Sequence, residues 1–538
     1  MGRLLPMGLV LLAFGCSSSK SPSGTGGRAS VLQHHNDLAR DGLYIDPALT
    51  QAAVMGTAGT SGGGLQLDAT FANANVAGYV YAQPLYLAGT GANPDLVIVA
   101  TEMNNVYAFD ATTGAQVWTK STETLGTPAS NLGSGAGGDL PCGGITPSLG
   151  ITGTPVIDET TRTIYLDAMA VDTSSGSRVV EHRVHALDAT TGNERSGWPV
   201  NLNSTASSDG TAFDSTLQNQ RGAMTLLGAK VFIPFGGHEG DCGGYHGWVV
   251  GITTTGKPAV SAWATRAIAG GIWGSSGIAS DGTSLFFATG NSKSSAAAAG
   301  NTSSGDSNGS WGDSEAVFKL PTSLTPPAMA TTTDYFVAGN WVALDDVDAD
   351  LGGTSPILVK APGATPSNLV VAMGKDHYAY LLDRANLGGM DAAPLAKVAA
   401  STSVIIDAAA SYTTSKGTYL VFKGVGATCP NGQTGGLTAL KIAAANPPTL
   451  SVAWCGGPGT SYSPAVSQTD GGGANTIVWS VGNDEKLHGV DGDSGVSVFD
   501  GGPTAMSAVT SIQAPIVANG RIFVASNTQI YAFKPVSN

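Results

Sequence analysis

A short strand-like motif recurs eight times along the chain, and this repetition limits the possible folds more than any other feature. Its clearest copy is Tyr107-Ala108-Phe109-Asp110, in which an aromatic, a small and an apolar residue precede an aspartate. The eight copies begin at Tyr107, His185, Val250, Phe318, Tyr380, Thr438, His488 and Tyr531. Repeats spaced by a few tens of residues indicate a solenoid, a propeller or a comparable array rather than a chain of separate domains.

Other strand-like segments accompany most copies and give each repeat the content of a small sheet. One begins next to a proline, as in Gln83-Pro84-Leu85, and proline is tolerated at the first residue of a strand. Another is a wholly apolar run such as Leu96 to Ala100, which is typical of a strand buried on both faces. An outer strand follows the turn that begins at Asp110. The sequence therefore predicts an all-β fold, an eight-bladed β-propeller of four-stranded antiparallel blades.

The last repeat lacks its outer strand, because only a few residues follow its third strand. The segment Gly64 to Phe71 alternates polar and apolar residues and precedes the first blade. We expect this N-terminal strand to complete the last blade, since pairing the two ends of the ring removes open sheet edges. Residues 31–538 are thus predicted to form a single propeller whose ring is closed by the N-terminal strand.

The first thirty residues indicate export. Arg3 precedes an apolar run that ends at Gly15, and this run is too short to span a bilayer. It is followed by Cys16 and a row of serines, which resembles the lipobox of bacterial lipoproteins. We predict a signal peptide over residues 1–16 with lipidated Cys16, and a flexible Gly/Ser tether over residues 17–30. The alternative is an ordinary cleaved signal with an incidental cysteine. The expected location is the bacterial cell envelope, with the lipid as the only membrane contact.

Four further cysteines, an even number in an exported chain, suggest two disulfides. Cys429 and Cys455 lie within one repeat, so we expect them to pair, which leaves Cys142 for Cys242. Four cysteines allow three pairings, and the spacing alone does not choose among them.

The charge balance bears on the partners. The net charge is −14, and the 25 lysines and arginines form no cluster. A protein that binds nucleic acid needs a basic footprint, so nucleic acid is not an expected partner. A small alcohol or sugar, or another envelope protein, remains as the expected partner.

One segment links the repeat to a known family. The first repeat continues as Asp110-Ala-Thr-Thr-Gly-Ala-Gln-Val-Trp118. This resembles the repeat of the quinoprotein alcohol dehydrogenase superfamily, Ala-x-Asp-x-x-Thr-Gly-x-x-x-Trp. The resemblance implies a structural role between blades for Trp118 and for Trp198. It implies the fold more strongly than an activity, because the same fold also hosts non-catalytic binding lipoproteins.

The alcohol-oxidising members of that family hold pyrroloquinoline quinone over the central channel, where a Ca²⁺ ion bridges cofactor and protein. The resemblance implies that Glu239 and Asn291 are Ca²⁺ ligands, which are oxygen donors of the kind that this ion prefers. It implies that Trp273 is the floor on which the quinone stacks, and that Lys375 bonds the quinone oxygens.

The catalytic base has two candidates in an acidic segment ahead of the fifth repeat. The resemblance implies that Asp348 or Asp350 takes the proton of the substrate hydroxyl while a hydride passes to the quinone. The chain departs from the family in lacking adjacent cysteines near the cofactor, since Cys142 stands alone. It also lacks a haem-binding motif, so the electrons would need an external acceptor.

Each of these residues has a structural alternative, such as a packing tryptophan, an asparagine in a turn or a solvated acidic loop. A second possible metal site combines His238, Asp241 and His246, although their spacing is unspecific. The competing function is a non-catalytic propeller that acts as a scaffold for an envelope protein or a glycan.

Overall fold

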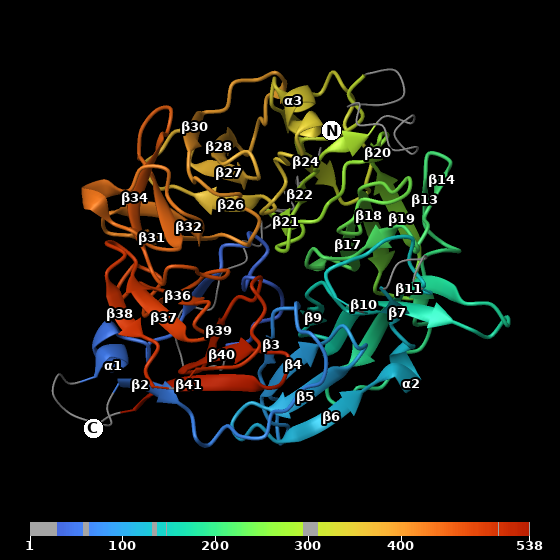
Figure 1. Cartoon of the computed structure of the whole chain (residues 1–538), viewed down its shortest axis with the longest axis horizontal. Coiled ribbons are helices and arrows are strands. Elements are labelled where there is room, and N and C mark those ends of the chain that lie inside the picture. Colours follow the sequence, from blue (N-terminus) through green and yellow to red (C-terminus); the bar gives the residue numbers. More distant parts are fainter. Residues whose placement is uncertain are drawn as a thin grey trace, which may run out of the picture.

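The computed structural model describes residues 29–56, 64–131, 137–146, 148–293, 310–503 and 505–536. Its main sheets are arranged around a central channel as an eight-bladed β-propeller (Figure 1), which confirms the predicted all-β fold. Each blade is an antiparallel sheet whose strands we count from the channel outward. All eight copies of the repeated motif form third strands, so the repeat was located correctly.

The first four blades follow the order of the sequence. Blade 1 contains β3 (Leu85–Leu87), β4 (Leu96–Ala100), β5 (Val106–Asp110) and β6 (Gln116–Lys120). Blade 2 contains β9 (Val156–Asp158), β10 (Thr163–Asp172), β11 (Val179–Asp188) and β12 (Val200–Asn201). Blade 3 contains β16 (Thr225–Leu227), β17 (Lys230–Gly237), β18 (Trp248–Thr253) and β19 (Val260–Ala264). Blade 4 contains β21 (Ala279–Ser280), β22 (Ser284–Ala288), β24 (Ala316–Pro321) and β25 (Tyr335–Val337).

The remaining blades complete the ring. Blade 5 contains β26 (Ile357–Lys360), β27 (Asn368–Met373), β28 (Tyr378–Asp383) and β30 (Ala396–Ala399). Blade 6 contains β31 (Ala410–Thr414), β32 (Gly417–Lys423), β33 (Leu437–Ile442) and β34 (Leu450–Gly456). Blade 7 contains β35 (Ala465–Gln468), β36 (Ile477–Val481), β37 (Leu487–Asp491) and β38 (Ser497–Asp500). Blade 8 contains β39 (Ile516–Ala518), β40 (Arg521–Ala525), β41 (Ile530–Val536) and β2 (Gly64–Leu67).

Short elements occupy the connections or extend the sheets. The helices are α1 (Gln51–Met55), α2 (Thr122–Leu125), α3 (Trp341–Asp346) and the 3₁₀ turn η3 (Pro430–Gly432). The additional strands are β1 (Leu43–Ile45), β7 (Ala129–Ser130), β8 (Ser148–Leu149), β13 (Ser207–Ser208), β14 (Thr211–Ala212), β15 (Gln218–Asn219), β20 (Ile268–Ala269), β23 (Ser292–Lys293) and β29 (Gly389–Met390). None of the helices in the described part of the chain is long and apolar enough to cross a membrane.

The hydrophobic core lies between neighbouring blades. One cluster, for example, joins Leu85 and Ile98 of blade 1 to Ile157 and Leu187 of blade 2. The strands near the channel are apolar on both faces because each face packs on another blade. Burial between blades thus drives the ring together and leaves the central channel available to polar groups.

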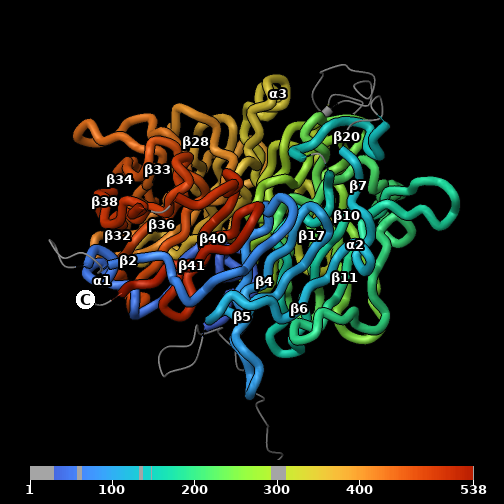
Figure 2. The backbone as a smooth tube through the Cα atoms, turned by 60° about the horizontal axis from the view of Figure 1, so that its bottom comes forward, coloured from blue at the N-terminus to red at the C-terminus, as the bar shows by residue number. Residues whose placement is uncertain are grey.

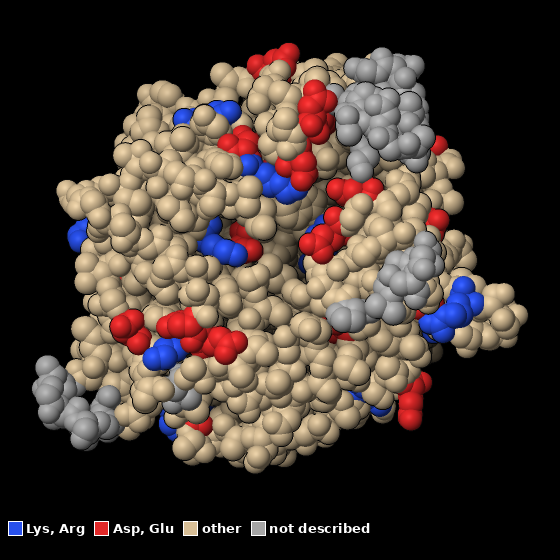
Figure 3. Space-filling view, viewed as in Figure 1, with Lys and Arg blue, Asp and Glu red and all other residues tan. Residues whose placement is uncertain are grey.

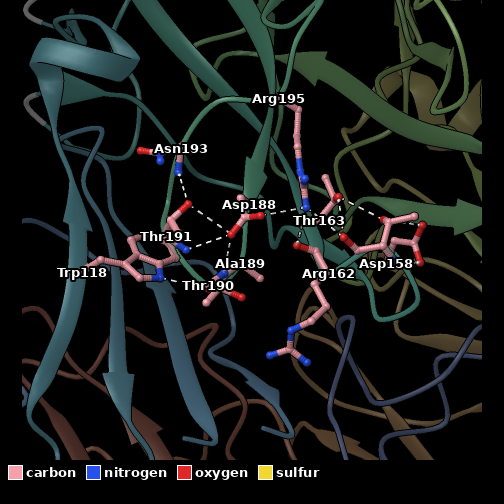
Figure 4. A network of polar contacts seen from close by, with 11 residues as sticks. Trp118, Asp158, Arg162, Thr163, Asp188, Ala189, Thr190, Thr191, Asn193 and Arg195 are labelled. Carbon is pink, nitrogen blue, oxygen red and sulfur yellow. Dashed lines mark hydrogen bonds and ion pairs between the residues drawn. The ribbon is translucent and has the colours of Figure 1, made fainter. Parts of the chain in front are cut away.

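The tryptophan of the repeat connects the outer parts of neighbouring blades. Trp118 on β6 is buried, and its indole N–H donates a 3.0 Å hydrogen bond to the carbonyl of Ala189 in blade 2. Figure 4 shows the indole against the turn that begins at Asp188. A β-carbon on Gly192 of this turn would lie 2.7 Å from the indole, so the glycine permits the close approach. The predicted structural role of Trp118 agrees with this contact.

Substitution of this tryptophan tests the contact between blades. We expect Trp118→Phe to lower the free energy of unfolding by about 1 kcal/mol, because the Ala189 carbonyl loses its buried donor. Urea unfolding followed by circular dichroism measures the change. Val117→Ala, at an exposed position of the same strand, is the matched control and should unfold as the wild type does. Equal midpoints for Trp118→Phe and the wild type would contradict the proposed role.

Ring closure follows the prediction. Strand β2 pairs antiparallel with β41, and Figure 2 shows the two strands side by side. Just beyond β2, the buried carboxylate of Asp68 lies 2.8 Å from Arg521 Nε and 2.7 Å from Lys534 Nζ. Although burial acts to raise the pKa of Asp68, these hydrogen bonds outweigh it and lower that pKa. The carboxylate therefore ties the N-terminal strand to the last blade.

A second closure, which the sequence did not predict, comes from residues 31–46, here called the inner arm. Its backbone hydrogen-bonds to the first strands of blades 1, 2, 4, 5, 6 and 7 in turn, and β1 pairs in parallel with β35. Asp46 accepts a hydrogen bond from Gly520 of blade 8. Arg40 reaches blade 3. The inner arm thus connects all eight blades from within the channel.

Both predicted disulfides, Cys142–Cys242 and Cys429–Cys455, are present. The predicted signal peptide, Cys16 and most of the tether lie outside the described residues. The tether was predicted to extend to residue 30, but Ala29 hydrogen-bonds with Asn519 and Ser30 with Glu159. These are the two residues of the predicted tether that the structure describes, and both contact the turns of the blades.

Candidate functional site

The candidate residues lie on the connections at one end of the channel, which we call the channel mouth. Each first strand begins, and each second strand ends, at this end because the two strands are antiparallel. Arg221 and Trp273 precede first strands, whereas Glu239 and Lys375 follow second strands. Viewed from this face, the molecule is hollowed at the centre, and acidic and basic side chains surround the hollow (Figure 3).

Trp273 is half-buried and carries two cations against its indole ring. Lys375 Nζ lies 5.2 Å from the ring centroid, and the guanidinium carbon of Arg221 lies 5.5 Å from it. Cations within about 6 Å of an indole centroid are attracted by the negative face of the ring. The structure therefore places a flat aromatic surface and two positive charges together at the channel mouth.

Lys375 connects two aspartates of very different exposure. Its ammonium lies 2.8 Å from Asp350 and 2.6 Å from Asp348, whose side chains are 2% and 59% exposed. Burial raises the pKa of Asp350, and the charge of Lys375 opposes this rise. Burial acts to lower the pKa of Lys375, but its ion pairs outweigh that effect and raise it. The lysine is therefore a firmly held cation.

Asn291 joins this group through its backbone. Its N–H donates a 2.6 Å hydrogen bond to Asp350, the carboxylate that also holds Lys375. A β-carbon on Gly290 would lie 2.8 Å from Asp350 Oδ1 and 2.9 Å from Trp273 Nε1. The absence of a side chain at Gly290 thus lets the aspartate and the tryptophan flank the same stretch of backbone. Trp273, Asn291, Asp350 and Lys375 form one cluster.

Two buried acids behind this cluster were not predicted. Glu315 accepts a 2.7 Å hydrogen bond from the Leu351 N–H, and Asp345 accepts hydrogen bonds from Ser292. Burial, followed by the charges of Asp350 and Asp345, raises the pKa of Glu315 well above its usual value. Burial raises the pKa of Asp345 to about 6. Glu315 thus fixes the backbone just after Asp350, and Asp345 fixes the residue just after Asn291.

Arg221 is the most informative residue that the sequence analysis missed. Burial lowers the pKa of its guanidinium, and its Nε atom is buried without a hydrogen-bond partner. Its Nη2 donates a 3.4 Å hydrogen bond to the carbonyl of Gly237. It lies shortly before β16, as Trp273 lies shortly before β21, so both residues enter the channel mouth from the connection ahead of a first strand.

Glu239 stands apart from the cluster. Its side chain is exposed, although its charge is close enough to oppose the lowering of the Arg221 pKa. The loop that carries Glu239 is fastened by the Cys142–Cys242 disulfide, which joins it to the connection between blades 1 and 2. The two predicted calcium ligands, Glu239 and Asn291, therefore belong to the same end of the channel but to different parts of it.

The alternative metal site at His238, Asp241 and His246 was wrong. His238 pairs with the Thr216 carbonyl, Asp241 accepts the Tyr245 hydroxyl, and His246 pairs with the Thr265 carbonyl. Throughout the residues that the structure describes, no group of three or more His, Cys, Asp or Glu side chains is arranged to hold a metal ion. The loop separates the three side chains because each is used in a local hydrogen bond.

No protein-family model matches the chain, and no curated protein matches it. Solved structures do match. The quinohemoprotein alcohol dehydrogenase of Comamonas testosteroni is 14% identical with a TM-score of 0.57, over 95% of this chain and 81% of that one. Alcohol dehydrogenase ADHIIG of Pseudomonas putida HK5 is 12% identical with a TM-score of 0.57, over 95% and 80%.

A europium-containing methanol dehydrogenase is 13% identical with a TM-score of 0.55, over 92% of this chain and 89% of that one. The structural similarity shows a common fold. At identities this low it carries no information about the reaction. The chain has the β-propeller fold of the quinoprotein alcohol and methanol dehydrogenases.

Proposed function

We propose that the channel mouth binds a planar aromatic anion of the pyrroloquinoline quinone class and that the protein oxidises an alcohol or a sugar with it. The observation that carries the proposal is the pair of cations, Arg221 and Lys375, against the indole of Trp273. A flat tricarboxylate needs an aromatic surface to stack on and positive charges for its carboxylates. Arg221, with an unpartnered buried Nε, offers such a donor.

The oxidation also requires a hydride acceptor and a base, and the chain supplies a residue for the base. When bound, pyrroloquinoline quinone supplies a hydride acceptor. Asp350 is better suited than Asp348 to take the hydroxyl proton, because it is buried beside Trp273 and has a raised pKa. Lys375 would hold the carboxylate of Asp350 in position and would also contact the oxygens of the quinone.

Calcium fits the described donors less well than the quinone does. Ca²⁺ takes about six to eight oxygen ligands. Asp350, the carboxylate nearest to Asn291, is already neutralised by Lys375, and Glu239 is exposed. The described side chains therefore offer fewer free oxygen donors than a calcium ion takes.

The test is reconstitution of the full exported chain. Purified protein is mixed with pyrroloquinoline quinone, with and without Ca²⁺, and alcohol- or sugar-dependent reduction of an artificial dye is followed. We expect dye reduction that requires the quinone and is abolished by Asp350→Asn, while Asp348→Asn retains most of it. Glu239→Ala and Asn291→Ala test whether these residues are calcium ligands. If both are ligands, each substitution should abolish the activity.

The outcomes separate the two candidate functions. Tight quinone binding without turnover would indicate a quinone-binding protein that is not a dehydrogenase. Failure to bind the quinone would favour the alternative function, a scaffold for an envelope protein or a glycan. The lipid on Cys16 and the envelope location also remain proposals. Mass spectrometry of the mature N-terminus tests both, since a diacylglyceryl group on Cys16 is the expected result.

A further inference from the structure

We infer that the channel mouth contains a second binding subsite, formed by Tyr79, Tyr81 and Glu102, and that it takes a polyhydroxylated ligand such as a sugar or a polyol. The inference deepens the proposed function, on which it rests, by naming the substrate class. The three residues belong to the entry into blade 1 and to the end of its second strand, β4. Blade 1 lies across the ring from blade 5, which carries Lys375 (Figure 1).

The first observation is a carboxyl group with an unused oxygen. Glu102 is fully buried, and its Oε2 accepts a 2.7 Å hydrogen bond from the Gly150 N–H. Its Oε1 is buried and makes no hydrogen bond of normal geometry, although the Thr152 hydroxyl is near enough to the carboxyl group to oppose the rise in its pKa. A buried polar atom without a partner carries a desolvation cost of about 1 to 3 kcal/mol, which a bound hydroxyl group or water would remove.

The second observation is an aromatic surface beside that carboxyl. Tyr79 and Tyr81 are stacked with their ring centroids 6.5 Å apart, and Tyr79 is 44% exposed. The Glu102 N–H donates a 2.9 Å hydrogen bond to the Tyr79 carbonyl, which places the backbones of these two residues side by side. Burial, followed by the charges of Glu102, Tyr79 and Glu239, raises the pKa of Tyr81 to about 12. Tyr81 is therefore near enough to Glu102 and Glu239 for both charges to act on it, and its hydroxyl lies 3.5 Å from the Ile145 carbonyl.

This combination suits a particular ligand chemistry. The apolar C–H face of a sugar ring packs on an exposed aromatic ring, and its hydroxyl groups require both donors and acceptors. Burial raises the pKa of Glu102 to about 7, so at neutral pH its carboxyl group can serve in either role. A simple alcohol would use the hydrogen bond but not the aromatic surface. The subsite therefore favours a ligand with several hydroxyl groups.

The position also fits the proposed reaction. Glu102 follows the second strand of blade 1 as Lys375 follows that of blade 5, so both side chains belong to the same end of the channel. A polyol held at Tyr79 and Glu102 would extend from blade 1 into the hollow that Trp273 borders. The subsite would then determine which hydroxyl-bearing substrates are retained.

The experiment measures binding directly and needs no quinone. Saturation-transfer NMR and calorimetry are applied to the full chain with hexoses, pentoses, sorbitol and xylitol, and with 1-propanol as a ligand with one hydroxyl group. We expect millimolar binding of at least one polyhydroxylated ligand, weakened about tenfold by Glu102→Gln and by Tyr79→Ala, and no binding of propanol. Tyr378→Ala, at an exposed tyrosine of blade 5, is the matched control and should bind as the wild type does.

The failure modes are distinct. Absence of binding for every sugar and polyol, or wild-type binding by both Glu102→Gln and Tyr79→Ala, overturns the subsite. Quinone binding is measured in the same variants and should be unchanged. Sugar binding without quinone binding would support the subsite and refute the proposed dehydrogenase, whereas the reverse result would refute the subsite alone.

Discussion

Replacement of Arg40 with alanine is expected to destabilise the propeller by at least about 3 kcal/mol. Arg40 is fully buried in the channel, and its guanidinium donates to the carbonyls of Ile278 and Met224 and to the hydroxyl of Thr225. These acceptors belong to blades 3 and 4, so one side chain joins two blades to the inner arm. Its removal leaves buried acceptors without donors and a cavity among them.

Urea unfolding followed by circular dichroism measures the free energy change, and hydrogen exchange locates it. We expect residues 31–46 to lose protection in Arg40→Ala, and Arg40→Lys to recover only part of the stability because an ammonium cannot reach both blades. Lys257→Ala removes an exposed lysine from the turn between β18 and β19 and should leave the unfolding midpoint unchanged. An unchanged midpoint in Arg40→Ala would refute the structural role of the inner arm.

The second large effect is expected at Arg221. Arg221→Ala should raise the dissociation constant for pyrroloquinoline quinone about 10- to 100-fold, because a charge-assisted hydrogen bond to a ligand anion is worth about 1.5 to 3 kcal/mol. The half-buried guanidinium of Arg221 already lies against Trp273, so it needs no rearrangement to meet a carboxylate of a ligand stacked on the indole. Calorimetric titration of the quinone into each variant gives the comparison.

Two controls make this result specific. Arg195→Ala removes a half-exposed arginine that is paired with Asp188 at the periphery of blade 2 and should leave the dissociation constant unchanged. Arg221→Lys keeps the charge but loses the planar pair of donors, so its affinity should fall between those of the wild type and Arg221→Ala. Equal affinities for Arg221→Ala and the wild type would remove Arg221 from the site.

The sequence predicted the ring well because its signals are local and repeated. The motif at Tyr107 and its seven copies place the third strand of every blade, and the alternation after Gly64 identifies the closing strand. The inner arm has no such signal. Apart from the short strand β1, it makes isolated hydrogen bonds to successive blades instead of a continuous ladder, and His35 and Arg40 adopt left-handed backbone conformations. A segment of this kind has no strand periodicity to read.

The candidate site was predicted in part for a related reason. The resemblance located Trp273, Asn291 and Lys375, each of which follows or precedes a recognisable strand. It did not choose between Asp348 and Asp350, which differ by two positions in sequence but greatly in burial. Arg221 and Glu102 were missed because their importance depends on neighbours from other blades, which only the closed ring brings near.

The central claim is that the ring assembles Arg221, Trp273 and Lys375 into one ligand site. A crystal structure of the protein grown with pyrroloquinoline quinone tests this most directly. The account predicts the quinone stacked on the Trp273 indole, with its carboxylates or carbonyl oxygens bonded to Arg221 and Lys375. A quinone bound elsewhere on the molecule, or a channel mouth that stays without it at saturating concentration, would contradict the account.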